Sequence, residues 1–157
     1  AIIGTFAGLS FWFPKMFGRM MNDTLGKIHF WGTIIPFNCI FIPLFVLGAA
    51  GEHRRIFDYS MFAELARPEL RHLDQFATVS LLIMLSFQLV FFYNLITSLL
   101  WGPKAEKNPW QSNTLEWTAD SPPPHGNWTV LPTVYRGPYE YSTPGRDQDY
   151  WPQNAPN

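Results

Sequence analysis

Two long stretches without a charged side chain most constrain the fold of this 157-residue chain. No Asp, Glu, Lys or Arg occurs in residues 28–51 or in residues 75–103. A mainly apolar, uncharged run of about 18 or more residues is typical of a transmembrane helix, because about 20 residues at a rise of about 1.5 Å cross the hydrocarbon layer of a bilayer. Both runs are therefore predicted to cross a membrane.

A third uncharged run, residues 1–14, is too short to span a bilayer by itself. It has neither a basic leader nor a small-residue cleavage site, which argues against a secretory signal. We interpret it as the end of a helix that starts earlier. Because the sequence opens without an initiator methionine, we expect it to be the C-terminal part of a longer polypeptide.

The predicted fold class is an all-α integral membrane protein. The end of one helix (about residues 1–17) and two full spans (about 25–50 and 70–101) would form a portion of a transmembrane helix bundle over residues 1–102. Pro36 and Pro43 fall inside the second helix, where each removes an amide donor and should bend it.

The last part of the chain, residues 103–157, is predicted to be an extended tail outside the membrane. It holds ten of the fourteen prolines and shows no apolar periodicity. Its many tryptophans and tyrosines can anchor an extended segment on another protein surface.

Several function classes are disfavoured by what the chain lacks. A net charge of −1 without a basic tract gives no footprint for nucleic acid. The single cysteine, Cys39, excludes a disulfide within the chain, and we expect it to be a small buried apolar residue. We find no Cys/His cluster at metal-ligand spacing, no phosphate-binding glycine loop and no paired carboxylates. No catalytic residue and no metal site are predicted within this chain.

An adjacent pair of arginines, Arg54 and Arg55, follows the second apolar run and has no nearby run of acids. Guanidinium groups pair strongly with carboxylates away from water. Neighbouring side chains on a regular helix diverge by about 100°, but the preceding Gly48 and Gly51 permit an irregular backbone that can aim both at neighbouring carboxylates. The pair therefore predicts an anion site, for cofactor carboxylates or, more weakly, lipid head groups.

Two histidines have open interpretations. His29 lies near the start of the second predicted helix and could relay protons or form a hydrogen bond that holds two helices together. His53, beside the arginines, could relay protons or be an ordinary solvated loop residue.

With the helices placed, an ordered set of short motifs resembles the C-terminal part of subunit I of heme-copper respiratory oxidases of the cytochrome c oxidase type. The similarity covers roughly residues 1–142 and rests on the order of the motifs. These are Trp12-Phe13-Pro14-Lys15, Asn22-Asp23-Thr24, Gly26-Lys27-Ile28-His29-Phe30, the segment 51–55, Thr114-Leu115-Glu116-Trp117 and Ser121-Pro122-Pro123-Pro124.

The resemblance implies a bundle of twelve or more helices that reduces dioxygen to water and moves protons across the membrane. It also implies a low-spin heme a, a high-spin heme a3 and a copper ion, with the axial and copper ligands outside this chain. Arg54 and Arg55 match the arginines that contact heme propionates in this family. Glu52 and His53 stand where relatives often have Met-Pro, so charge near the propionates would differ here.

Partners and location follow from the same resemblance. We expect the remainder of subunit I, other oxidase subunits, membrane lipid, and cytochrome c or quinol as electron donor. The membrane would be a bacterial or mitochondrial inner membrane. Five basic residues lie on the tail side of the membrane. The opposite side has two when Arg54 and Arg55 are not counted, which favours a cytoplasmic or matrix tail.

A second hypothesis from another class is a non-catalytic membrane scaffold subunit or a transporter fragment. In that case Arg54 and Arg55 would bind lipid or an acidic loop of a partner.

Overall fold

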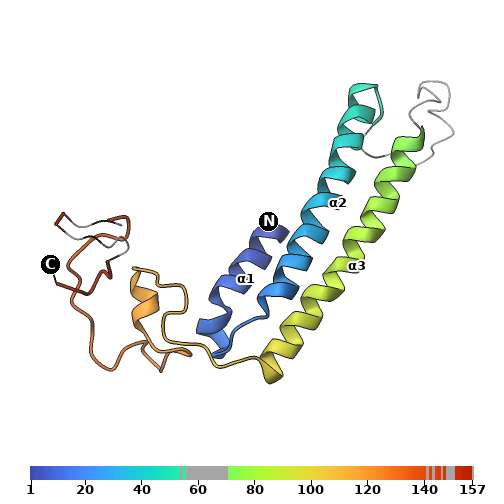
Figure 1. Ribbon diagram of the computed structural model, residues 1–157. Coiled ribbons are helices and arrows are strands. Elements are labelled where there is room, and N and C mark those ends of the chain that lie inside the picture. The colour runs from blue at the N-terminus through green and yellow to red at the C-terminus, as the bar shows by residue number, and fades with distance from the viewer. Residues whose placement is uncertain are drawn as a thin grey trace. The chain divides into compact units, whose positions relative to one another are not determined.

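The computed structural model describes residues 1–53, 55, 71–140, 142, 144–145, 147 and 151–156. Among these described residues, three α-helices carry the fold: α1 spans Ile2–Phe17, α2 spans Asp23–Ala49 and α3 spans Arg71–Trp101 (Figure 1). The 3-10 turn η3 covers Leu115–Thr118. Apart from an isolated bridge between Arg19 and Lys104, the described residues form no β-structure, and the predicted all-helical class is confirmed.

The chain divides into two compact units. One comprises Asp23–Asn94, which is α2 with most of α3, and the other comprises Ala1–Asn22 together with Leu95–Asn157. In the first unit, α2 and α3 run side by side in opposite directions (Figure 1).

The buried face of α2 is a stripe at helical spacing. Its members recur every three or four residues, as one side of a helix requires. They are His29, Gly32, Thr33, Pro36, Ile40, Pro43 and Leu47. Both prolines of α2 thus belong to its packed side, and the helix continues through them.

Among the glycines of this unit, Gly32 has the closest neighbour on another helix. A Cβ atom at that position would overlap the Phe87 ring of α3. The missing side chain is what allows the aromatic ring to approach the backbone of α2, so the Gly32–Phe87 contact sets the local spacing of the two helices.

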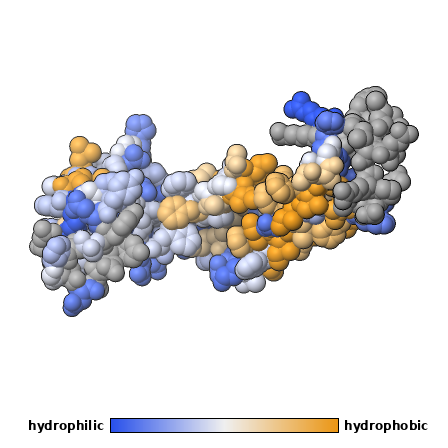
Figure 2. Space-filling model, turned by 90° about the horizontal axis from the view of Figure 1, so that it is seen from above, coloured by the Kyte–Doolittle hydropathy of each residue, from blue (hydrophilic) through white to orange (hydrophobic). Residues whose placement is uncertain are grey.

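The apolar surfaces of these helices are mostly uncovered within this chain. The helices Asp23–Ala49 and His72–Trp101, 27 and 30 residues long, are long and apolar enough to cross a membrane. Only 28% and 17% of their most apolar windows are buried, whereas the core helix of a soluble protein would be mostly buried. Hydrophobic residues gather over the helical part of the face in Figure 2, and the tail is mainly hydrophilic there.

In the second unit, the backbone after α1 pairs with the backbone after α3. Gly18 ends α1 in a left-handed conformation with φ 64°, and its N–H donates to Pro14 O at 2.8 Å. Met20 N–H donates to Pro103 O, and Ala105 N–H donates to Gly18 O, both at 2.9 Å. These bonds join two segments that are far apart in the sequence.

The tail is held mainly by side chains that bind backbone groups. Arg136 donates from both terminal nitrogens, to Pro152 O and Ala155 O, at 2.7 Å each. The buried Gln153 amide donates to Arg136 O at 3.0 Å and accepts from Leu115 N–H at 3.1 Å. Long-range contacts of this kind replace the ladders that a proline-rich segment cannot form.

The helix ends differ slightly from those expected. The second helix begins at Asp23 rather than near residue 25, because Asp23 lies in its first turn and pairs with Lys27 one turn later at 2.6 Å. The third helix ends at Trp101, and Gly102 N–H completes its last turn by donating to Ser98 O at 2.9 Å. The assignment of residues 1–102 to the membrane and 103–157 to its surface stays a prediction.

The Gly32–Phe87 contact generates the first testable prediction. Gly32→Ala in the full-length protein should lower the free energy of unfolding by about 1–3 kcal/mol, because the added methyl group forces the helices apart. Thermal unfolding in detergent measures the effect. Gly26→Ala is the matched control in the same helix, since its Cβ would meet nothing within 4 Å. Equal stability of the two variants would contradict the packing described here.

Candidate functional site

The turn that ends α2 precedes the arginine pair. Gly51 adopts φ 105°, a conformation that favours glycine, and the N–H of Glu52 donates back to Leu47 O at 3.0 Å. The helix α2 therefore ends at Ala49, before the arginines, and the backbone at Gly51 is not helical.

Arg55 is exposed beyond this turn, and Arg54 lies outside the described residues. Arg55 forms no ion pair with any carboxylate in the described part of the chain. An exposed guanidinium can bind a carboxylate through two parallel N–H donors. The joint aim of both arginines at one anion stays a prediction.

Glu52 and His53 separate the turn from the arginines. Partial burial and, to a smaller extent, repulsion from Asp74 raise the pKa of Glu52 above its ordinary value. His53 is exposed. Glu52, two residues before Arg54 in the sequence, therefore gives up its proton less readily than a solvated glutamic acid.

His29 lies in a polar contact between α2 and α3. Its ring is buried, and Nε2 lies 3.1 Å from Gln88 Oε1. Gln88 Nε2 in turn donates to Thr33 Oγ1 at 3.1 Å and to Met84 O at 2.9 Å. Of the two interpretations of His29, the structure shows the hydrogen bond between helices. The partner Gln88 was not singled out from the sequence, although it is a rare amide within an uncharged run.

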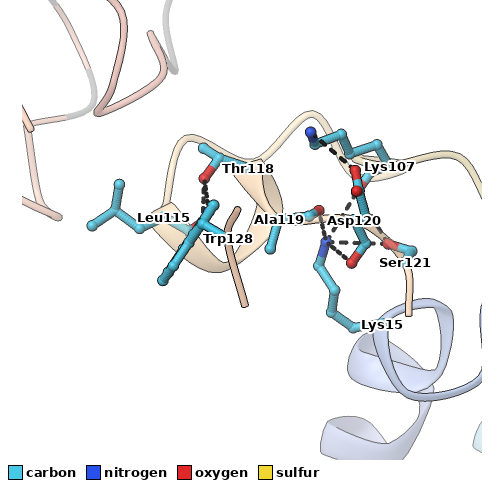
Figure 3. Close-up of polar contacts among 8 residues, drawn as sticks. All are labelled: Lys15, Lys107, Leu115, Thr118, Ala119, Asp120, Ser121 and Trp128. Atoms are coloured by element: carbon cyan, nitrogen blue, oxygen red, sulfur yellow. Dashed lines mark hydrogen bonds and ion pairs between the residues drawn. The ribbon is translucent and has the colours of Figure 1, made fainter. Parts of the chain in front are cut away.

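A second polar site surrounds Lys15 near the end of α1 (Figure 3). This side chain is 7% exposed, and its ammonium group contacts oxygens contributed by residues 107 and 119–121 of the tail. The sequence identifies Lys15 only as a member of the ordered motif set and does not predict this site. Its position within the aromatic Trp12-Phe13-Pro14-Lys15 segment was the available signal.

Metal-ligating side chains do not gather in the described residues: no three His, Cys, Asp or Glu side chains come together as a metal ion would require. Cys39 is half-buried. The exposed guanidinium of Arg55 is the kind of donor that could bind an acidic group of a cofactor.

Comparison with known proteins identifies the family. Residues 1–85, more than half of the chain, match the family described as "Cytochrome C and Quinol oxidase polypeptide I". The matched residues contain α1, α2 and the first half of α3. The resemblance found in the sequence motifs is confirmed.

Individual relatives extend this similarity into the tail. The chain is 47% identical over 147 residues to the alternative cytochrome c oxidase subunit 1 of Bradyrhizobium diazoefficiens, with 92% of this chain and 25% of that relative covered. It is 37% identical to cytochrome c oxidase subunit 1 of Thermostichus vulcanus, with coverages of 94% and 26%. It is 35% identical to the cytochrome bo(3) ubiquinol oxidase subunit 1 of Buchnera aphidicola, with coverages of 85% and 20%.

The chain spans about a quarter of the length of these relatives. Its two long apolar helices agree with a membrane location for the matched part. The chain is therefore an integral membrane protein, and it belongs to the cytochrome c and quinol oxidase polypeptide I family.

Proposed function

We propose that this chain is part of the catalytic subunit of a proton-pumping heme-copper oxidase that reduces O2 to water with electrons from cytochrome c. The observation that carries the proposal is the 47% identity over 92% of the chain to a protein named as a cytochrome c oxidase subunit 1. A relative named as a ubiquinol oxidase is 35% identical, close to the 36–38% of several relatives named as cytochrome c oxidases, so the choice of cytochrome c as donor rests on the 47% identical relative.

The cofactors of such an oxidase would be heme a, heme a3 and a copper ion, held by ligands outside this chain. When bound, they would supply electron transfer and oxygen reduction. The residues of this chain would position the porphyrin edge and exclude water: Arg54 and Arg55 would bind heme propionates through paired N–H donors. The end of α2 before Arg55 and the absence of a described carboxylate partner for Arg55 support this role.

The chain would reside in a bacterial or mitochondrial inner membrane, with its tail on the cytoplasmic or matrix side. Its partners would be the remainder of subunit I, other oxidase subunits and lipid. The basic residues Lys15, Arg19, Lys27, Lys104 and Lys107 on the predicted tail side support that orientation.

The proposal predicts heme in the intact protein. A reduced-minus-oxidised visible spectrum of the purified complex should show the absorbance bands of a-type heme, because the family assignment implies such cofactors. A complex that contains this chain in stoichiometric amount and shows no heme bands would favour the scaffold hypothesis.

The arginine pair predicts a redox effect. Arg54→Leu or Arg55→Leu in the intact complex should lower a heme midpoint potential by roughly tens of millivolts, since a positive charge about 10 Å away stabilises the reduced heme by ~1–2 kcal/mol at an effective dielectric constant of ~20. Spectroelectrochemical titration measures the shift.

Lys27→Leu provides the matched control, because it removes the same charge at the opposite end of α2. Its effect should be small, since the two ends of the 27-residue helix are farther apart than the screening length of about 8–10 Å. Unchanged potentials in both arginine variants would remove the propionate assignment.

The raised pKa of Glu52 predicts a pH-dependent stability. Between its ordinary pKa and its raised pKa, the folded state binds more protons than the unfolded state, so stability falls as pH rises through this window. Glu52→Gln should therefore be more stable than the parent protein at pH 7, and the two should converge below about pH 4, where the carboxyl is protonated in both states. Thermal unfolding of the full-length protein across this range measures the difference. A constant difference at all pH values would show that ionisation of Glu52 is not its cause.

A further inference from the structure

The Lys15 ammonium group lies within a set of oxygen atoms from the tail. Its Nζ donates to the backbone oxygens of Lys107 at 3.2 Å and Ala119, and to Ser121 Oγ at 3.1 Å (Figure 3). Asp120 O lies farther away, at 3.4 Å. An ammonium has three N–H donors, so these oxygens provide an acceptor for each of them.

The groups that contact the Lys15 ammonium group are neutral. Among the described residues, no acidic side chain lies within ion-pair distance of its Nζ, and the Asp120 carboxylate pairs instead with Lys107 Nζ at 3.1 Å. The Trp117 ring lies 5.1 Å from the Lys15 nitrogen, within the range of a cation–π interaction. Carbonyl dipoles and an aromatic face therefore stabilise the charge of Lys15, whereas most buried lysines are stabilised by a carboxylate.

The surrounding segment is folded so that its oxygens converge. The short helix η3 buries Trp117, which is 1% exposed, against Phe11 of α1 with ring centroids 5.1 Å apart. Thr118 Oγ1 donates to Leu115 O at 2.7 Å and accepts from Trp128 Nε1 at 3.1 Å (Figure 3). At the other end, Trp110 stacks on Phe11 and donates from Nε1 to Phe11 O at 2.9 Å.

The aromatic contacts fix where residues 110 and 117 lie against α1. They donate no hydrogen bond to the oxygens that face the Lys15 ammonium group. Lys107 O also accepts from Ser121 Oγ at 3.3 Å, and this side of the site is exposed. Ala119 O is buried, so without the ammonium donor this carbonyl would lose a hydrogen bond in the buried part of the site. A cation with N–H donors therefore stabilises the segment at this point.

We propose that residues 107–121 form an oxygen-lined binding site for a primary ammonium ion, and that Lys15 occupies it as a built-in ligand that holds this segment against α1. The site selects for a charged group with several N–H donors, because its lining consists of backbone oxygens, a hydroxyl and an aromatic face. A primary alkylammonium ion is the ligand that it would take when the lysine stem is removed.

Hydrogen exchange in the full-length protein within its purified complex tests the proposal. Lys15→Ala should speed amide exchange in residues 107–121 by at least about tenfold, which corresponds to losing one hydrogen bond to a charged group. n-Propylammonium replaces the atoms that this substitution removes, and millimolar amounts should restore slow exchange. Tetramethylammonium carries the same charge without N–H donors and should not.

Two further variants separate charge from packing. Lys15→Met keeps a long apolar stem without the cation and should also speed exchange, so it decides the question if Lys15→Ala cannot be purified. Lys107→Met removes an exposed ion pair with Asp120 and leaves the backbone acceptor of residue 107 in place, so its exchange should match the parent protein.

Parent-like exchange in Lys15→Met, equal rescue by tetramethylammonium, or no rescue of Lys15→Ala by propylammonium would each overturn the proposal. Exchange is measured without turnover, so this result does not depend on the proposed oxidase activity.

Discussion

Polar groups inside long apolar helices must find hydrogen-bond partners within the protein, because lipid offers none. The pair of α2 and α3 meets this requirement through His29, Gln88 and Thr33, which bond to one another across the helix interface. Gly32, one residue from Thr33, lets the Phe87 ring approach beside them. The polar cluster and the adjacent Gly32–Phe87 contact together define how the two helices can pair, since apolar side chains alone would tolerate several registers.

The tail also depends on hydrogen bonds made by side chains, but there they bind backbone groups. Its prolines prevent regular backbone pairing, so long side chains supply the donors that backbone oxygens require. Lys15, Arg136 and Gln153 each bind backbone groups from distant parts of the sequence. An extended segment held at such points keeps a defined path without becoming a helix or a strand.

The helices were predictable from the sequence because charge-free runs leave few alternatives, and their ends were displaced by only one or two residues. The family followed from the order of short motifs, and the match over residues 1–85 agrees with it. The oxygen site around Lys15 was not predictable. Its acceptors are backbone oxygens of residues 107, 119 and 120 and the hydroxyl of Ser121, and a sequence does not show where backbone oxygens of an irregular tail converge. The partner of His29 was missed for a related reason: register across a helix pair depends on packing.

The positive charges of this chain fall into two physical classes, and the difference bears on where a cofactor could bind. Lys15 is buried and its donors are used by oxygens of the same chain, so it has nothing left to offer an external anion. Arg55 is exposed after a helix end and has no described carboxylate partner. A guanidinium keeps its charge at any physiological pH. The positive charge that could hold an anionic cofactor therefore lies after the end of α2, at Arg55, and not at the buried Lys15.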